Sequence, residues 1–189
     1  MLLVDDAIWP WRGRRWAHLV SDSDLDELHD LAHRIGLPYV AFQGDHYDVH
    51  EELRTRAVEL GAVPTPARDL VRALRVAGLR RRGPLPPWQW VERRGGRSTS
   101  LAAVAERATA DLDLDLAGVL DRAGDTAVHG PFDEVGWARR GPETLVLASS
   151  AEVRPVPAGL ERPGPGLALH RSSGERGTYV ELVVSGAPT

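Results

Sequence analysis

The sequence contains no cysteine, which excludes disulfides, thiolate zinc sites and a cysteine nucleophile. Any metal would therefore bind to histidine, aspartate, glutamate or backbone oxygen. Lysine is absent as well, so all 23 basic residues are arginine. No apolar run approaches the roughly 20 residues that cross a membrane. Asp5 and Asp6 stand where a signal peptide would carry positive charge. We therefore expect a cytoplasmic protein without a membrane partner.

What is present is typical of a globular chain: 189 residues, 42% of them hydrophobic and 26% charged. The net charge of -4 argues against wholesale binding to a phosphate backbone. The charge is unevenly spread, because residues 81–100 carry a basic belt in which a single glutamate, Glu92, faces five arginines: Arg81, Arg82, Arg93, Arg94 and Arg97. The same stretch is rich in proline and glycine and holds Trp88 and Trp90. We predict that it is a linker or a packed arm.

The first eighty residues predict a small mixed α/β sheet with the element order β-β-α-β-α-β-α. Strands are expected at 2–4, 16–20, 39–43 and 62–63. The three helices are expected to begin at helix-capping residues, namely Ser23, Asp48 with Glu51 as a capping box, and Thr65 followed by Pro66.

The remaining residues, 101–189, predict a smaller α+β region of unknown role. One helix is expected from Ser100 through Leu101 and Ala105, and a second helical piece at 116–123. Glycine and proline separate four expected strands of an antiparallel sheet at 144–148, 152–156, 167–170 and 178–184.

Two groups of polar residues follow the predicted strands. If strands 16–20 and 39–43 run parallel through a helical crossover, Asp22 and the loop 43–48 share one sheet edge with two helix N-termini, which favour anions. We expect Asp22, His46 and Asp48 to bind a divalent metal there, with Gln43 or Tyr47 orienting a substrate. Asp5, Asp6 and His18 form a second group, near the start of strand 16–20.

Each of these residues also has a purely structural interpretation. Asp22 and Asp48 lie where helix caps belong, His18 is equally compatible with a satisfied interior histidine, and nearby arginines can pair with the two N-terminal aspartates. His29 and His33 have the i, i+4 spacing of a helical metal pair. The apolar residues of their helix place both on its outer face, which predicts a solvent-facing role.

The N-terminal motifs taken together resemble the DUF4031 family, a bacterial and phage domain of unknown function. The matching segments are Val4-Asp5-Asp6, His18-Leu19-Val20-Ser21-Asp22, Ile35-Gly36-Leu37, Phe42-Gln43, His46-Tyr47-Asp48-Val49 and Gly61-Ala62, with Leu25, Leu28, Arg54 and Ala57 between them. The resemblance covers roughly residues 1–80 and implies a domain boundary near Arg80. It also implies that these histidine, aspartate and glutamine positions belong to a family pattern. Some members carry lysine at the position of Arg54. This suggests that a positively charged side chain here contacts an anion. The family name supplies no activity.

The residues favour a metal-dependent hydrolase or nuclease that acts on a phosphate-bearing ligand and uses Mn, Zn or Mg. The expected site comprises Asp22, His46 and Asp48, joined by Asp5, Asp6 and His18, with Gln43 orienting the substrate and Arg54 offsetting phosphate charge. One alternative is a non-catalytic nucleotide- or nucleic-acid-binding module. It would use the two helix N-termini, the basic belt and the predicted loop 7–15, which contains Arg12, Arg14 and Arg15. Another is a protein-interaction domain whose partners the sequence does not identify.

Overall fold

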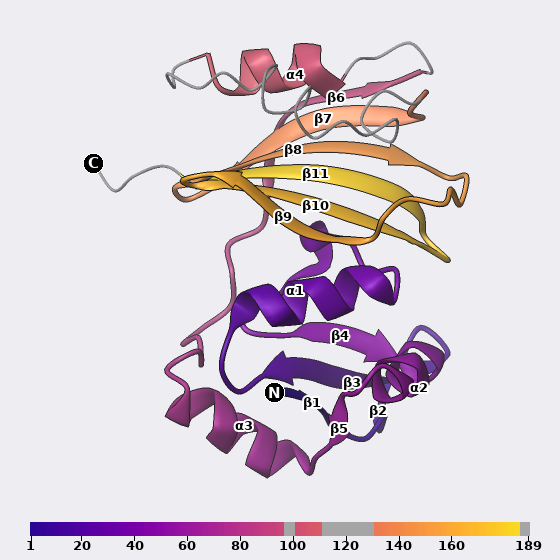
Figure 1. The fold of residues 1–189 in the computed structure, drawn as a ribbon, viewed down its shortest axis with the longest axis vertical. Coiled ribbons are helices and arrows are strands. Elements are labelled where there is room, and N and C mark those ends of the chain that lie inside the picture. Colours follow the sequence, from indigo (N-terminus) through magenta and orange to yellow (C-terminus); the bar gives the residue numbers. More distant parts are fainter. Residues whose placement is uncertain (97–100, 111–130, 186–189) are drawn as a thin grey trace. The chain divides into compact units, whose positions relative to one another are not determined.

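A computed structural model describes residues 1–96, 101–110 and 131–185, and the chain forms two compact units, Met1–Leu85 and Pro86–Thr189 (Figure 1). Each unit contains its own sheet. The predicted α/β content is confirmed. In the described part of the chain, no helix combines the length and apolar character needed to span a membrane.

The first sheet is organised around β3 (Arg14–Ser21), which pairs antiparallel with β1 (Leu2–Val4), β2 (Trp9–Trp11) and β4 (Tyr47–His50). The short strand β5 (Val63–Pro64) pairs parallel with β1. Figure 1 shows β4, β3 and β1 side by side. Neighbouring strands of this sheet, such as β3 and β4 or β1 and β5, therefore come from distant parts of the sequence.

The predicted strand at 39–43 is wrong, because Tyr39–Ala41 form a 3-10 turn after Pro38. The rings of Tyr39 and Phe42 pack around His29, with centroid distances of 5.1 and 4.6 Å. This apolar run therefore serves core packing rather than strand pairing. The strand comes later, at β4, and is antiparallel to β3 where a parallel crossover was expected.

Three helices accompany this sheet: α1 (Leu25–Arg34), α2 (Glu51–Glu59) and α3 (Ala67–Val76). Asp24 rather than Ser23 caps α1, since its side chain accepts a hydrogen bond from the Asp26 backbone N–H. The predicted capping box of Asp48 is also wrong, because Asp48 lies within β4 and the residue before α2 is His50. Leu70 and Leu74 of α3 pack on Leu3 and Val20 of the sheet.

A tight hairpin joins β2 to β3 where the sequence predicts only a loop. Arg12 and Gly13 both have positive φ, 49° and 75°, which is the backbone signature of the two-residue turns that match strand twist. Trp9 then lies opposite Trp16. The side chains of Trp9 and Trp11 remain more than half exposed, so the hairpin presents aromatic surface to solvent.

The second unit holds the larger sheet, although the sequence suggested a smaller region. Its six antiparallel strands follow the order β6-β7-β8-β11-β10-β9. They span Gln89–Gly95 (β6), Glu134–Arg140 (β7), Glu143–Ser150 (β8), Gly159–Gly164 (β9), Leu167–Gly174 (β10) and Gly177–Ser185 (β11). Helix α4 (Leu101–Ala108) packs on this sheet through Leu101, Val104 and Ala105. The predicted strands at 144–148, 167–170 and 178–184 fall within β8, β10 and β11, whereas 152–156 is not a strand.

The stretch that the sequence marks as a linker or arm contains β6, which pairs with β7. Two of its arginines form ion pairs, Arg93 with Glu134 and Arg94 with Glu92. Arg107 of α4 also binds Glu92, with the Nη2 and Oε1 atoms 2.7 Å apart. These arginines therefore form ion pairs within the second unit. Arg97, the expected cap Ser100 and the expected helical piece at 116–123 lie outside the described residues.

Candidate metal site

The pairing of β3 with β4 places His18 directly opposite Asp48, and His46 lies immediately before β4. The two imidazole rings meet edge to face, with their centroids 5.2 Å apart. One ring nitrogen from each histidine and one carboxylate oxygen of Asp48 all lie within 4.8 Å of one another. The sequence predicted these three residues in two separate groups, and the antiparallel register brings them together.

A buried carboxylate backs each of these two histidines. Asp5 Oδ2 lies 2.8 Å from His18 Nδ1, and Asp5 Oδ1 accepts the His18 backbone N–H at 2.6 Å. Asp45 Oδ1 lies 2.6 Å from His46 Nδ1. Both carboxylate side chains are only 3% exposed. Because each Nδ1 is engaged, Nε2 is the ring nitrogen left for a ligand. This is the carboxylate–histidine arrangement that orients metal-binding imidazoles.

The charges of this cluster are coupled. Burial lowers the pKa of His46, but hydrogen bonds and charge from Asp48 and Asp45 outweigh burial and raise it above its ordinary value. The His46 imidazole lowers the pKa of Asp48. Burial raises the pKa of Asp45, but its hydrogen bonds to His46, the Arg81 backbone and Arg80 lower it overall. Asp45, His46 and Asp48 therefore favour one another's charged forms, and a metal that binds His46 competes with its proton.

A pocket of about 250 Å³ opens beside the cluster. Its polar lining residues are Asp5, His18, His46 and Arg80, and its apolar lining comes from Trp9, Val20 of β3 and residues of α3. The Arg80 guanidinium donates to Asp45 Oδ2 at 2.7 Å, and the Arg81 backbone N–H donates to the same oxygen at 2.9 Å. Asp45 therefore connects His46 to the segment that follows α3.

Asp22, the first predicted metal ligand, lies away from this cluster. It follows β3, four residues beyond His18, which corresponds to roughly 13 Å along a strand. Its Oδ1 atom pairs with the amino nitrogen of Met1 at 2.5 Å. The expected convergence with His46 depended on a parallel strand pair that does not form. Asp22 therefore does not belong to the site.

Four other residues that the sequence proposed for the site lie in different surroundings. Asp6 is 81% exposed and pairs with Arg54 Nη2 at 2.9 Å, so it lies outside the cluster. Arg54 Nε also donates to the Asp5 carbonyl at 2.6 Å, which holds this guanidinium beside the site. The exposed Gln43 amide donates to the Ala41 carbonyl. Tyr47 is fully buried with its hydroxyl 2.8 Å from His29 Nδ1, so it has no access to substrate.

Two residues beside the cluster, Asp45 and Arg80, were not among the candidates predicted from the sequence. Asp45 follows Gly44, and this Gly-Asp pair has the composition of an ordinary turn. The signal that could have identified it is its adjacency to His46. Arg80 begins a run of three arginines that composition assigned to a linker. Its role depends on a contact 35 residues away, which no local pattern reveals.

The prediction that His29 and His33 face solvent is wrong, since they are 5% and 0% exposed. Tyr39, Phe42 and Tyr47 surround the His29 ring. His33 Nδ1 lies 2.8 Å from the Leu37 carbonyl, and burial lowers the pKa of His33 from 6.5 to about 4. The i, i+4 spacing here reflects core packing.

The fold and the cluster define the first unit as a small α/β domain with two carboxylate-backed histidines at the edge of a pocket. Residues 2–77 match the model of the family described as Protein of unknown function (DUF4031). This match lies within the first unit and supports the resemblance that its sequence motifs indicate. No curated protein and no solved structure matches the chain.

Proposed function

We propose that the first unit is a metal-dependent hydrolase or nuclease that acts on a phosphate-bearing ligand. His18, His46 and Asp48 would bind one divalent cation. The observation that carries the proposal is the convergence of these three side chains within 4.8 Å while Asp5 and Asp45 hold the two rings. Two histidines and one carboxylate leave coordination positions open for water and substrate.

The donor set favours Zn or Mn over Mg, because Mg prefers oxygen ligands and the site offers two imidazoles. A divalent cation here would lower the pKa of a bound water and polarise a phosphoryl oxygen. The protein's own contribution is to orient both rings through their Nδ1 atoms. It also keeps Asp48, whose side chain is 50% exposed, at the open side of the site.

Two cations support a phosphate-bearing ligand rather than a neutral one. Arg54 is fixed beside the cluster by the Asp5 carbonyl and Asp6. Arg80 lines the pocket beside the cluster. Guanidinium groups match the geometry and charge of phosphate oxygens. Asp22, Gln43 and Asp6 have no role in this proposal, and a cytoplasmic location stays a prediction.

Hydrolysis of bis(p-nitrophenyl) phosphate with added Mn, Zn or Mg tests the proposal. We expect metal-dependent turnover that falls at least about a hundredfold in His18→Asn and His46→Asn, because each variant removes one ligand. Asp22→Asn is the matched control and should retain full turnover.

Unchanged turnover in both histidine variants would refute the proposed site. A parent protein that binds metal and oligonucleotide but hydrolyses neither this ester nor DNA or RNA would favour the non-catalytic binding module.

A further inference from the structure

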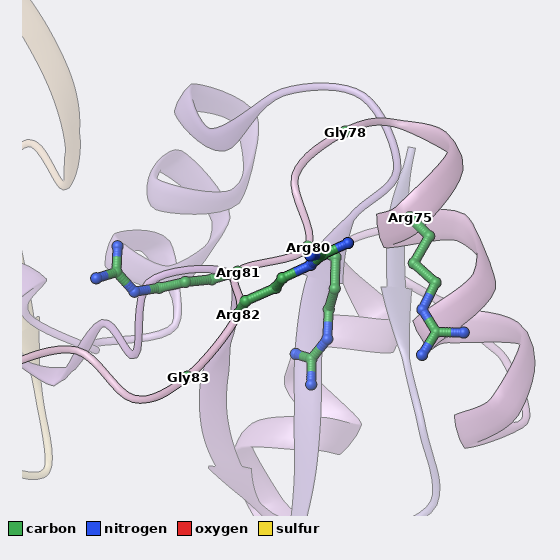
Figure 2. Close-up of a pocket in the computed structure, with 6 residues that line it drawn as sticks. All are labelled: Arg75, Gly78, Arg80, Arg81, Arg82 and Gly83. Atoms are coloured by element: carbon green, nitrogen blue, oxygen red, sulfur yellow. The ribbon is translucent and has the colours of Figure 1, made fainter.

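A second pocket in the first unit has a volume of about 630 Å³ and is lined by four arginines and two glycines: Arg75, Gly78, Arg80, Arg81, Arg82 and Gly83. Figure 2 shows Arg75 and Arg80 extending in the same direction from α3 and the segment after it. Arg82 reaches toward Arg80, whereas Arg81 points away. Gly78 and Gly83 have φ of 71° and 82°, which lets the backbone turn at both ends of the arginine run.

The charge of this arginine pocket is largely uncompensated. Arg80 pairs with Asp45, but within the described residues no carboxylate pairs with Arg75, Arg81 or Arg82, and none lines the pocket. Gathering like charges costs free energy that a bound anion recovers. Guanidinium groups bind phosphate oxygens through two parallel hydrogen bonds. The chemistry of the pocket therefore suits phosphate groups.

Arg80 lines both this pocket and the pocket of the metal site. Trp9 also lines the metal-site pocket, stands edge to face with His18 with the ring centroids 6.4 Å apart, and is 55% exposed. An exposed indole offers a stacking surface to any nucleobase. The pocket beside the His18–His46–Asp48 cluster thus offers both positive charge, from Arg80, and an aromatic surface, from Trp9.

We propose that the arginine pocket binds the phosphates of a single-stranded nucleic acid, whose strand crosses the His18–His46–Asp48 cluster toward Trp9. The pocket is wide enough for more than one phosphate, and a strand supplies adjacent phosphates together with a base for Trp9. The assignment of a substrate class rests on the proposed function. The binding itself requires no metal, because arginine and tryptophan make the contacts.

Fluorescence anisotropy of a labelled 12-nucleotide oligothymidylate, with the full chain in EDTA at 50–200 mM salt, tests the binding. Arg75→Gln/Arg82→Gln should weaken binding at least tenfold and reduce the slope of log K against log salt by about 1.4, since each phosphate contact contributes about 0.7 for single strands. Trp9→Ala should weaken binding about tenfold with an unchanged slope, because stacking releases no counterions.

The control variant Arg34→Gln/Arg56→Gln removes the same charge from α1 and α2, away from both pockets, and should bind within about twofold of the parent. Equal losses of oligonucleotide affinity in the two double variants would overturn the proposal. They would show that the strand is attracted by the overall positive charge and not by this pocket. Competition by ATP or inorganic phosphate at the same concentration of phosphate groups would also overturn it in favour of a small phosphate compound. Because EDTA removes metal, these outcomes stay separate from failure of the hydrolase proposal.

Discussion

The two histidine pairs of the first unit have opposite surroundings. His18 and His46 each contact a buried carboxylate and line a pocket. His29 and His33 instead contact a tyrosine hydroxyl and a backbone carbonyl inside the core. The spacing in sequence favours the second pair as a metal site, while the contacts favour the first.

The partner of Nδ1 and the access to Nε2 therefore decide whether each histidine can bind a ligand. A carboxylate partner favours the imidazolium and, when a metal binds, strengthens the ligand. Neutral partners and burial favour the uncharged ring, as the pKa of about 4 for His33 indicates. The first pair is therefore suited to ligand chemistry and the second to packing.

The largest expected effect concerns the buried pair. Burial lowers the pKa of His33 from 6.5 to about 4. Between these pH values, His33 is mostly protonated in the unfolded chain and mostly neutral in the folded unit. Stability should be complete above pH 6.5 and decline as the pH falls toward 4, by up to about 3 kcal/mol. Urea unfolding followed by NMR signals of α1 at several pH values measures this. His33→Asn should remove this component, and an identical pH dependence in both proteins would contradict it.

A smaller effect is expected behind the first pair. Asp45→Asn weakens the acceptor for His46 Nδ1 and the contact with Arg80. We expect metal affinity to fall about 10- to 100-fold, the usual cost of losing such a support. Isothermal titration with Zn or Mn measures it, with Asp30→Asn on α1 as the charge-matched control. The same affinity in Asp45→Asn and the parent would show that Asp45 does not orient the ring.

Gly44 offers a test of the loop that carries Asp45 and His46. It has φ of 101°, and an added Cβ would lie 2.7 Å from Arg81 Cδ and 3.0 Å from Leu85 Cγ. Gly61 has a similar φ of 106° but open space around it. Both alanine variants should lose about 1 kcal/mol for the backbone, and Gly44→Ala about 1 kcal/mol more for overpacking. Thermal unfolding compares them, and equal losses would contradict the close packing.

The smallest expected effect is at Asp22. Its carboxylate pairs with the Met1 amino group away from both histidine pairs. Asp22→Asn should therefore leave metal affinity within about twofold of the parent in the same titration. A larger loss of metal affinity would show that Asp22 contributes to the metal site.

Local patterns predicted the elements that depend on local interactions. The apolar periodicity of α1 and α3 located both helices, and the short apolar runs located β1 and most of β3. They failed at 39–50, where a short apolar run packs as a turn and the true strand is only four residues long. Strand pairing there depends on contacts across the sheet, which the sequence of one segment does not encode.

The candidate site likewise combines features that the sequence predicted with features that depend on strand pairing. Its residue types were predicted, with His18, His46, Asp48 and Asp5 among the candidates, but their grouping was wrong. The grouping depends on the register that sets His18 opposite Asp48. The faces of α1 were also misassigned, because Leu28, His29, Leu31, Ala32 and His33 are all buried and the apolar residues mark only part of its buried surface.

The most direct test of the metal site is the metal content of the purified, untagged chain, measured by elemental mass spectrometry after incubation with Mn, Zn or Mg and removal of free metal. We expect about one ion per chain in the parent and in His33→Asn, and a loss of that ion in His18→Asn and His46→Asn. Retention of metal in both of these variants, or no bound metal in the parent, would contradict it.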